Sequence, residues 1–118
     1  FLLESSSKKA AFLLHSTNKL KLKNTTIINA RMEELNPGNF PIPLEIITRA
    51  FGTIEKTIMV SRRLLDNPKT TLKMMKTSPL KGLKPLPKDF HVTEIKKIDV
   101  KGKDKEHILV TIAKRLNV

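Results

Sequence analysis

Short runs of apolar and β-branched residues alternate with amphipathic helical patterns along this chain, and this alternation limits the folds open to it. Apolar residues at helical spacing follow three serines that can cap a helix, so a helix is predicted over 7–20. A second helix is predicted to open at Gly52 and Thr53 and to end before Pro68, which cannot continue it. Strands are predicted at 1–3, 25–29, 44–48, 70–75, 90–100 and 108–112.

The order of these segments predicts the α/β fold class. Strands that alternate with helices typically form a parallel, doubly wound sheet. The last two strands are joined by a turn at 101–104 and are predicted to form an antiparallel hairpin at its edge. The proline-rich stretch 77–89 is expected to be a loop or a short broken helix. The predicted buried stripes are Ala10, Leu13, Leu14, Thr17 and Leu20 in the first helix and Ile54, Ile58, Ser61 and Leu65 in the second.

Charge points to a polyanionic partner. Lys and Arg number 23 and Asp and Glu 11 among 118 residues, which gives a net charge of +12. Nucleic acid is the simplest such partner, and the alternative is a basic protein from an organism whose proteins are rich in Lys and Asn. An anionic membrane surface is disfavoured, because no basic amphipathic helix stands out. The chain has five Phe and neither Trp nor Tyr, so few side chains could stack on bases. No apolar run approaches the roughly 20 residues that would cross a membrane.

Several kinds of catalytic site are excluded or disfavoured by composition. The chain has no Cys, which excludes a disulfide framework, a thiol nucleophile and a Cys-ligated zinc ion. The three histidines, His15, His91 and His107, match no metal-binding spacing and are expected to be structural or exposed. No nucleophilic triad or pair of catalytic carboxylates is evident. We therefore predict no metal site.

Several short motifs, in order along nearly the whole chain, resemble one family: the bacterial small-subunit ribosomal RNA guanine-N7 methyltransferases, known as RsmG or GidB. The resemblance is carried by Phe1–Ser6 with Lys8, Lys9, Phe12 and Leu13, by Leu20–Asn24, Ala30–Glu34 and Ile47–Phe51, and by Leu86, Pro87, Phe90–Val92 and His107–Val110.

This resemblance implies a class I, Rossmann-like methyltransferase sheet that uses S-adenosylmethionine. The implied substrate is a guanine in the decoding region of 16S ribosomal RNA, and the implied partner is the small ribosomal subunit in the cytoplasm. Guanine N7 carries a lone pair and no proton, so methyl transfer there is a direct displacement that needs no general base. We therefore expect no catalytic side chain, and expect positioning and electrostatics to carry the reaction.

The resemblance also implies roles for individual residues. Glu4 matches the acid that binds the cofactor ribose, although it could simply favour the start of a helix. Met32 and Glu33 match positions that meet the adenine, against the alternative of a core Met and a solvated Glu. Arg49 ends a strand and is expected to hold the cofactor or a substrate phosphate, unless it forms a structural ion pair, for example with Glu33. The expected contacts to substrate RNA are Arg31, Lys76, Lys81 and Lys84, with Lys88 nearby.

The chain departs from the family at its amino-terminal side. The family's first strand and glycine-rich loop are missing, and the four glycines, Gly38, Gly52, Gly82 and Gly102, form no cluster. That strand lies between the strands that end here at Glu4 and Arg49, so two half-sheets with exposed edges are expected. Either a preceding segment or another chain would then supply it. Smaller departures are Lys76-Thr77 in place of the family's "LKG" and Glu106 in place of a basic residue.

Three functions follow from these observations. The first is a methyltransferase of which residues 1–118 form a partial class I domain, monomeric or dependent on a missing amino-terminal segment. The second is a non-catalytic RNA-binding or ribosome-associated remnant of the family, which the missing glycine loop favours if the sequence is complete. The third is a basic structural protein whose motif matches are accidental.

Overall fold

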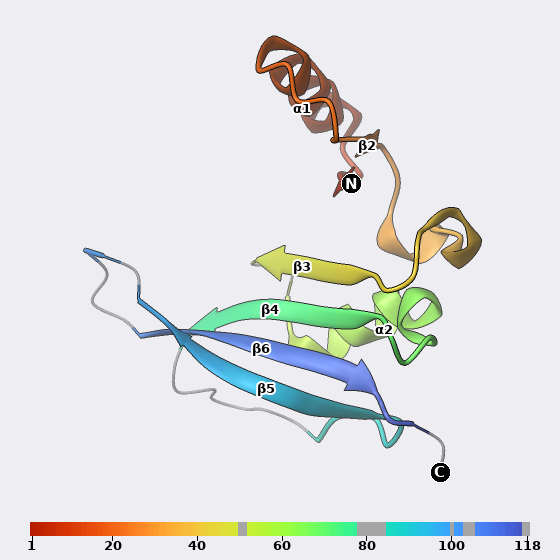
Figure 1. The fold of residues 1–118 in the computed structure, drawn as a ribbon, viewed down its shortest axis with the longest axis vertical. Coiled ribbons are helices and arrows are strands. Elements are labelled where there is room, and N and C mark those ends of the chain that lie inside the picture. The colour runs from red at the N-terminus through yellow and green to blue at the C-terminus, as the bar shows by residue number, and fades with distance from the viewer. Residues whose placement is uncertain (50–51, 78–84, 100, 103–105, 117–118) are drawn as a thin grey trace. The chain divides into compact units, whose positions relative to one another are not determined.

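Two β-α-β connections organise the chain (Figure 1). The computed structural model describes residues 1–49, 52–77, 85–99, 101–102 and 106–116. It separates the chain into two units, Phe1–Leu35 and Asn36–Val118. The elements in chain order are β1 (Leu2–Leu3), α1 (Ser7–Lys19), β2 (Ile27–Ile28), the 3-10 turns Met32–Glu34 and Pro37–Asn39, β3 (Glu45–Arg49), α2 (Ile54–Leu65), β4 (Thr71–Thr77), β5 (Phe90–Ile98) and β6 (His107–Lys114).

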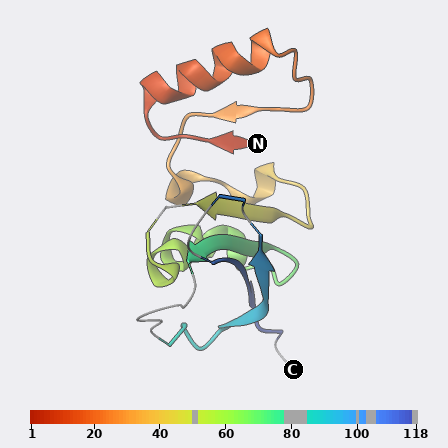
Figure 2. The same cartoon turned by 90° about the vertical axis from the view of Figure 1, so that its left-hand side faces the viewer.

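The first unit is a single β-α-β connection. Ser6 caps α1 by accepting a hydrogen bond from the Lys9 amide at 3.3 Å, which confirms the predicted serine cap. The strands β1 and β2 pair in parallel, and α1 lies along them in Figure 2. Each strand has only two paired residues, fewer than the sequence predicts for the second of them.

The small sheet of this unit leaves much of the predicted α1 stripe uncovered. Ala10 and Thr17 are buried, whereas Leu14 and Leu20 are 52% and 69% exposed. A pair of two-residue strands offers too little surface to cover a helix of 13 residues. The helix is therefore correctly predicted, but only part of its apolar stripe is buried.

The second unit is a four-stranded mixed sheet in the order β3-β4-β6-β5, with α2 on one face (Figure 1). The strands β3 and β4 are parallel and joined through α2, as the alternation of segments predicts. The predicted antiparallel hairpin of β5 and β6 is confirmed, and its second strand is the one that pairs with β4. Lys101 and Gly102 lie in the turn between them, where Gly102 has a φ of +77°.

The core of the second unit lies between α2 and the sheet. The predicted α2 stripe of Ile54, Ile58, Ser61 and Leu65 is buried as expected. Thr53 caps the helix by accepting a hydrogen bond from the Lys56 amide at 3.1 Å. The helix face packs against alternate residues of the two central strands, namely Leu72, Met74, Val110 and Ile112, all of which are fully or almost fully buried.

The larger sheet and the smaller one share no paired strand among the described residues. Two separate sheets agree with the two half-sheets that the sequence predicts, and the parallel strand pairs joined through helices confirm the α/β class. None of the helices in the described part of the chain has the length and apolar character that crossing a membrane requires.

Candidate functional site

The first group of predicted site residues lies at the carboxyl ends of β1 and β2. Glu4 follows β1, and its amide donates a hydrogen bond to the Ile28 carbonyl at 3.0 Å. Because parallel strands bring their carboxyl ends to one edge, the half-buried Glu4 lies beside the residues that follow β2. This is the edge at which open α/β sheets bind ligands.

Asn29 is a member of this edge that the sequence analysis missed. Its side-chain amide contacts the Ser7 hydroxyl at 3.0 Å. With the amide oriented so that its oxygen faces that hydroxyl, its nitrogen lies 3.1 Å from the Glu4 carbonyl and 3.2 Å from the Ser5 carbonyl. Asn29 thus joins the end of β2 to the turn that carries Glu4. The available signal was a polar amide directly after a β-branched run.

The remaining predicted residues of the first unit lie on the short turn that follows β2. The Arg31 amide donates a hydrogen bond to the Glu34 carboxylate at 3.3 Å, and this contact stabilises the turn. Met32 is half-buried, and Glu33 and Arg31 are exposed. Glu33 is therefore solvated, whereas Met32 is only half-buried and is not a core residue.

The second group lies at the carboxyl end of the β3-β4 pair. Arg49 is the exposed last residue of β3 and pairs in register with Met75 of β4. Lys76 follows Met75, so both predicted basic residues lie at one edge of the sheet. The Lys76 ammonium donates a hydrogen bond to the Gly52 carbonyl at 2.5 Å. Lys81 and Lys84 lie outside the described residues, and Lys88 is exposed.

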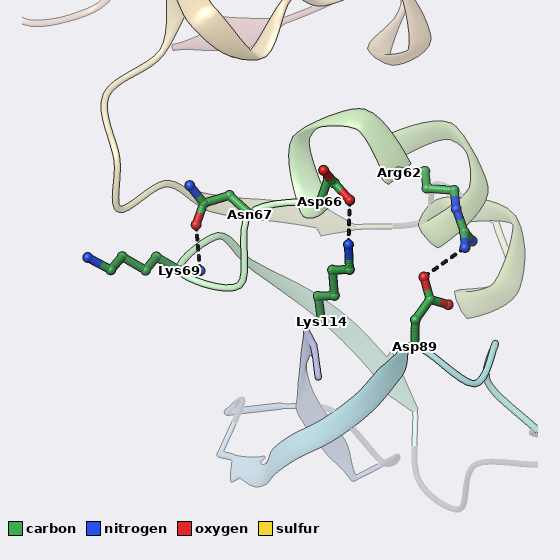
Figure 3. A network of polar contacts seen from close by, with 6 residues as sticks. All are labelled: Arg62, Asp66, Asn67, Lys69, Asp89 and Lys114. Carbon is green, nitrogen blue, oxygen red and sulfur yellow. Dashed lines mark hydrogen bonds and ion pairs between the residues drawn. The ribbon is translucent and has the colours of Figure 1, made fainter. Parts of the chain in front are cut away.

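The main polar network of the second unit is remote from this edge. Figure 3 shows Lys114 of β6 reaching Asp66 at the end of α2, and Arg62 of α2 bound to Asp89 at 2.8 Å. Since Ala113 pairs with Thr71, the first residue of β4, this network lies toward the opposite end of that strand from Lys76.

The network has a structural character. The hydrogen bond and charge of Lys114 lower the pKa of the Asp66 carboxyl below its ordinary value. The Arg62 guanidinium also lies 5.3 Å from the centre of the buried Phe90 ring. These contacts fasten α2 to the hairpin of β5 and β6.

A further ion pair joins the neighbouring strands β4 and β3. The Lys73 ammonium lies 2.8 Å from the Glu45 carboxylate on the neighbouring strand β3. Its hydrogen bond with Glu45 raises the pKa of Lys73, and the charges of Glu45 and Glu94 act in the same direction. Across the described ranges, no group of three or more His, Cys, Asp or Glu side chains could hold a metal ion.

The family model for GidB, the rRNA small subunit methyltransferase G, matches residues 1–110. The chain belongs to the GidB family. GidB relatives named Ribosomal RNA small subunit methyltransferase G include one from Pseudomonas entomophila, 36% identical over 109 residues, and one from Nitrosomonas eutropha, 32% identical over 113 residues. Each match covers 92% of this chain but only 50% or 52% of the relative, so the chain spans about half the length of these GidB proteins.

Solved structures support the same fold. An rRNA methylase from Streptococcus thermophilus matches with a TM-score of 0.54 and 15% identity, over 95% of this chain and 70% of that one. The Escherichia coli protein yhhF matches with a TM-score of 0.52 and 13% identity, over 97% of this chain and 64% of that one. At such low sequence identity, these two matches support the fold of this GidB chain and nothing about its function.

Proposed function

We propose that this chain forms the greater part of the cofactor-binding sheet of an S-adenosylmethionine-dependent methyltransferase that acts on guanine N7 of 16S ribosomal RNA. The observation that carries the proposal is the position of Glu4, at the carboxyl end of a parallel strand pair within a chain of the GidB family. An acid at this point of a nucleotide-binding α/β fold is suited to hydrogen-bond ribose hydroxyls. The partner would be the small ribosomal subunit, in the cytoplasm.

The described residues fit part of this cofactor. Glu4 would hold the ribose, Met32 and Glu33 would meet the adenine, and Arg49 would hold either the cofactor or a substrate phosphate. The glycine-rich loop that completes such sites has no counterpart among Gly38, Gly52, Gly82 and Gly102. The residues proposed here therefore concern the nucleoside side of the site.

When bound, the cofactor would supply a methyl carbon on a sulfonium sulfur, so that the N7 lone pair forms the new N–C bond as the C–S bond breaks and a neutral thioether leaves. The residues of this chain then need only orient the two reactants and balance charge as the sulfonium is lost. No proton leaves guanine N7, so no side chain has to act as a base. The RNA contacts proposed for Arg31, Lys81 and Lys84 would align the guanine by binding phosphates, which carries affinity but little sequence information.

A methyl-transfer assay tests this function. The protein is expressed from its complete coding sequence and incubated with labelled S-adenosylmethionine and small ribosomal subunits from a strain that lacks this methylation. Aniline cleavage after borohydride reduction then maps N7-methylguanine in the RNA. We expect one labelled guanine in 16S RNA, whereas label at another atom or in another RNA would contradict the proposal.

The second candidate function is a non-catalytic RNA-binding member of the family. It is favoured by the net charge of +12, which suits a polyanionic partner. In the same assay this candidate predicts tight, salt-dependent RNA binding without methyl transfer. A binding titration run beside the transfer assay therefore distinguishes the two functions.

A further inference from the structure

The hydrogen bond from Lys76 to Gly52 joins two segments that lie 24 residues apart in the sequence. Lys76 is near the carboxyl end of β4, and Gly52 lies two residues before α2. Because side chains alternate along a strand, Lys76 lies on the same face of β4 as the buried Leu72 and Met74. That face is the one covered by α2, so the half-buried lysine reaches the start of the helix along the sheet.

The carbonyl that Lys76 binds lies outside the hydrogen-bond ladder of α2. That ladder begins one residue later, where the Thr53 carbonyl accepts from the Thr57 amide at 3.0 Å and from the Thr57 hydroxyl at 2.8 Å. Gly52 also has a φ of +133°, a conformation that L side chains rarely adopt. The chain therefore turns sharply at a residue whose carbonyl is held by a side chain of another strand.

The positive charge of Lys76 does not stabilise α2. The amino-terminal end of a helix carries partial positive charge, so a nearby ammonium is placed against the helix dipole. Among the described residues, no carboxylate forms an ion pair with Lys76. The contact that accounts for its position is the hydrogen bond to Gly52.

We propose that Lys76 is a positioning residue that holds Gly52, and with it the start of α2, against the carboxyl end of β4. Arg49 is the register partner of Met75, the residue before Lys76, so Arg49 and the Gly52 carbonyl that Lys76 binds both lie at the carboxyl end of β4. This rests on the proposed function, in which Arg49 contacts the cofactor or a substrate phosphate. Lys76 then acts on the reaction through Arg49 and not by binding RNA itself.

The test uses three variants in the protein expressed from its complete coding sequence. Lys76→Met keeps the aliphatic stem and removes the donor, and Lys76→Arg restores a donor. Lys69→Met is a charge-matched control, because Lys69 is exposed before β4, toward the opposite end of that strand. If Lys76→Met does not fold by circular dichroism, Lys76→Ala takes its place.

Three measurements separate positioning from direct RNA binding. The amide resonance of Thr53, which shares a peptide unit with the Gly52 carbonyl, should move in Lys76→Met and stay in place in Lys69→Met. Methyl transfer in Lys76→Met should fall about 10-fold, the loss of one charge-assisted hydrogen bond, and Lys76→Arg should recover most of it. The slope of log RNA affinity against log salt should equal that of the Lys69→Met control.

Two results would overturn the proposal. One is an unmoved Thr53 resonance in Lys76→Met. The other is a salt slope flatter than that of Lys69→Met by about 0.7, the value for one lost phosphate contact on a single strand, which would make Lys76 an RNA ligand. If the unaltered protein transfers no methyl group, the proposed function fails, and the Thr53 resonance still decides whether Lys76 positions the turn.

Discussion

Arg49 is the residue whose replacement should most affect activity. We expect Arg49→Ala to lower methyl transfer by roughly 10–150-fold without unfolding the protein, since one charge-assisted contact contributes about 1.5–3 kcal/mol. Its side chain is exposed at the end of β3, so little packing is lost. The measurement is single-turnover transfer to small ribosomal subunits.

Arg63→Ala is the matched control for this change. Arg63 is exposed in the last turn of α2 and carries the same charge. Equal losses of activity in the two variants would assign the effect to net charge and remove Arg49 from the site.

Asp66 should give the unfolding free energy a dependence on acid pH. Lys114 lowers the folded-state pKa of Asp66 below its ordinary value of 3.8, so the contribution is present above that value and is lost as pH falls through the lower folded pKa. We expect the difference in unfolding free energy between the protein and Asp66→Asn to shrink below about pH 4. Urea unfolding at several pH values measures it, and a difference that stays constant with pH would contradict the assignment.

At the scale of the element, α2 should tolerate change on one face only. Ile58 is fully buried against the sheet, and we expect Ile58→Ala to cost about 2–5 kcal/mol of unfolding free energy. The neighbouring Met59 is 64% exposed, and Met59→Ala should change stability by no more than about 0.5 kcal/mol. Denaturant unfolding followed by circular dichroism compares the two, and similar costs would show that the α2 face is wrongly placed.

At the scale of the whole molecule, the 118-residue chain by itself should bind S-adenosylmethionine weakly or not at all. The chain has the residues proposed to bind the nucleoside, but no cluster of glycines that would supply main-chain amides. Isothermal titration calorimetry measures this directly. Low-micromolar binding by the 118-residue chain would show that the glycine loop is dispensable.

RNA binding should depend strongly on salt. With a net charge of +12 and few aromatic side chains, phosphate contacts are expected to supply most of the affinity. Three to five contacts to single-stranded RNA would give a slope of log affinity against log salt of about −2 to −3.5. Fluorescence anisotropy at several salt concentrations measures it, and a slope near zero would show that the charge is merely solvated surface.

A triple replacement locates part of this RNA footprint. Changing Lys81, Lys84 and Lys88 together to Gln should flatten the slope by roughly one to two units. The matched variant changes Lys8, Lys9 and Lys19 on α1 and removes the same charge. If only the α1 variant flattens the slope, the footprint lies on the first unit.

The sequence by itself determined the helices and their caps. Ser6 and Thr53 accept hydrogen bonds from amides three residues later, and such contacts depend only on neighbouring residues. The α2 stripe was predicted correctly because apolar residues at helical spacing bury one face wherever a large enough sheet receives it. The strands that end at Glu4 and Arg49 were also predicted from local sequence, namely from short runs of apolar and β-branched residues.

Only the tertiary structure decided which of these surfaces became a core and which side chains met. The α1 stripe stays partly exposed at Leu14 and Leu20 because its sheet has two short strands, a fact about pairing and not about the helix. The contact between Lys76 and Gly52 joins residues 24 positions apart, and no local pattern encodes it. Contacts of this kind depend on how α2 packs against β4, because that packing brings the Gly52 carbonyl and the Lys76 ammonium within reach.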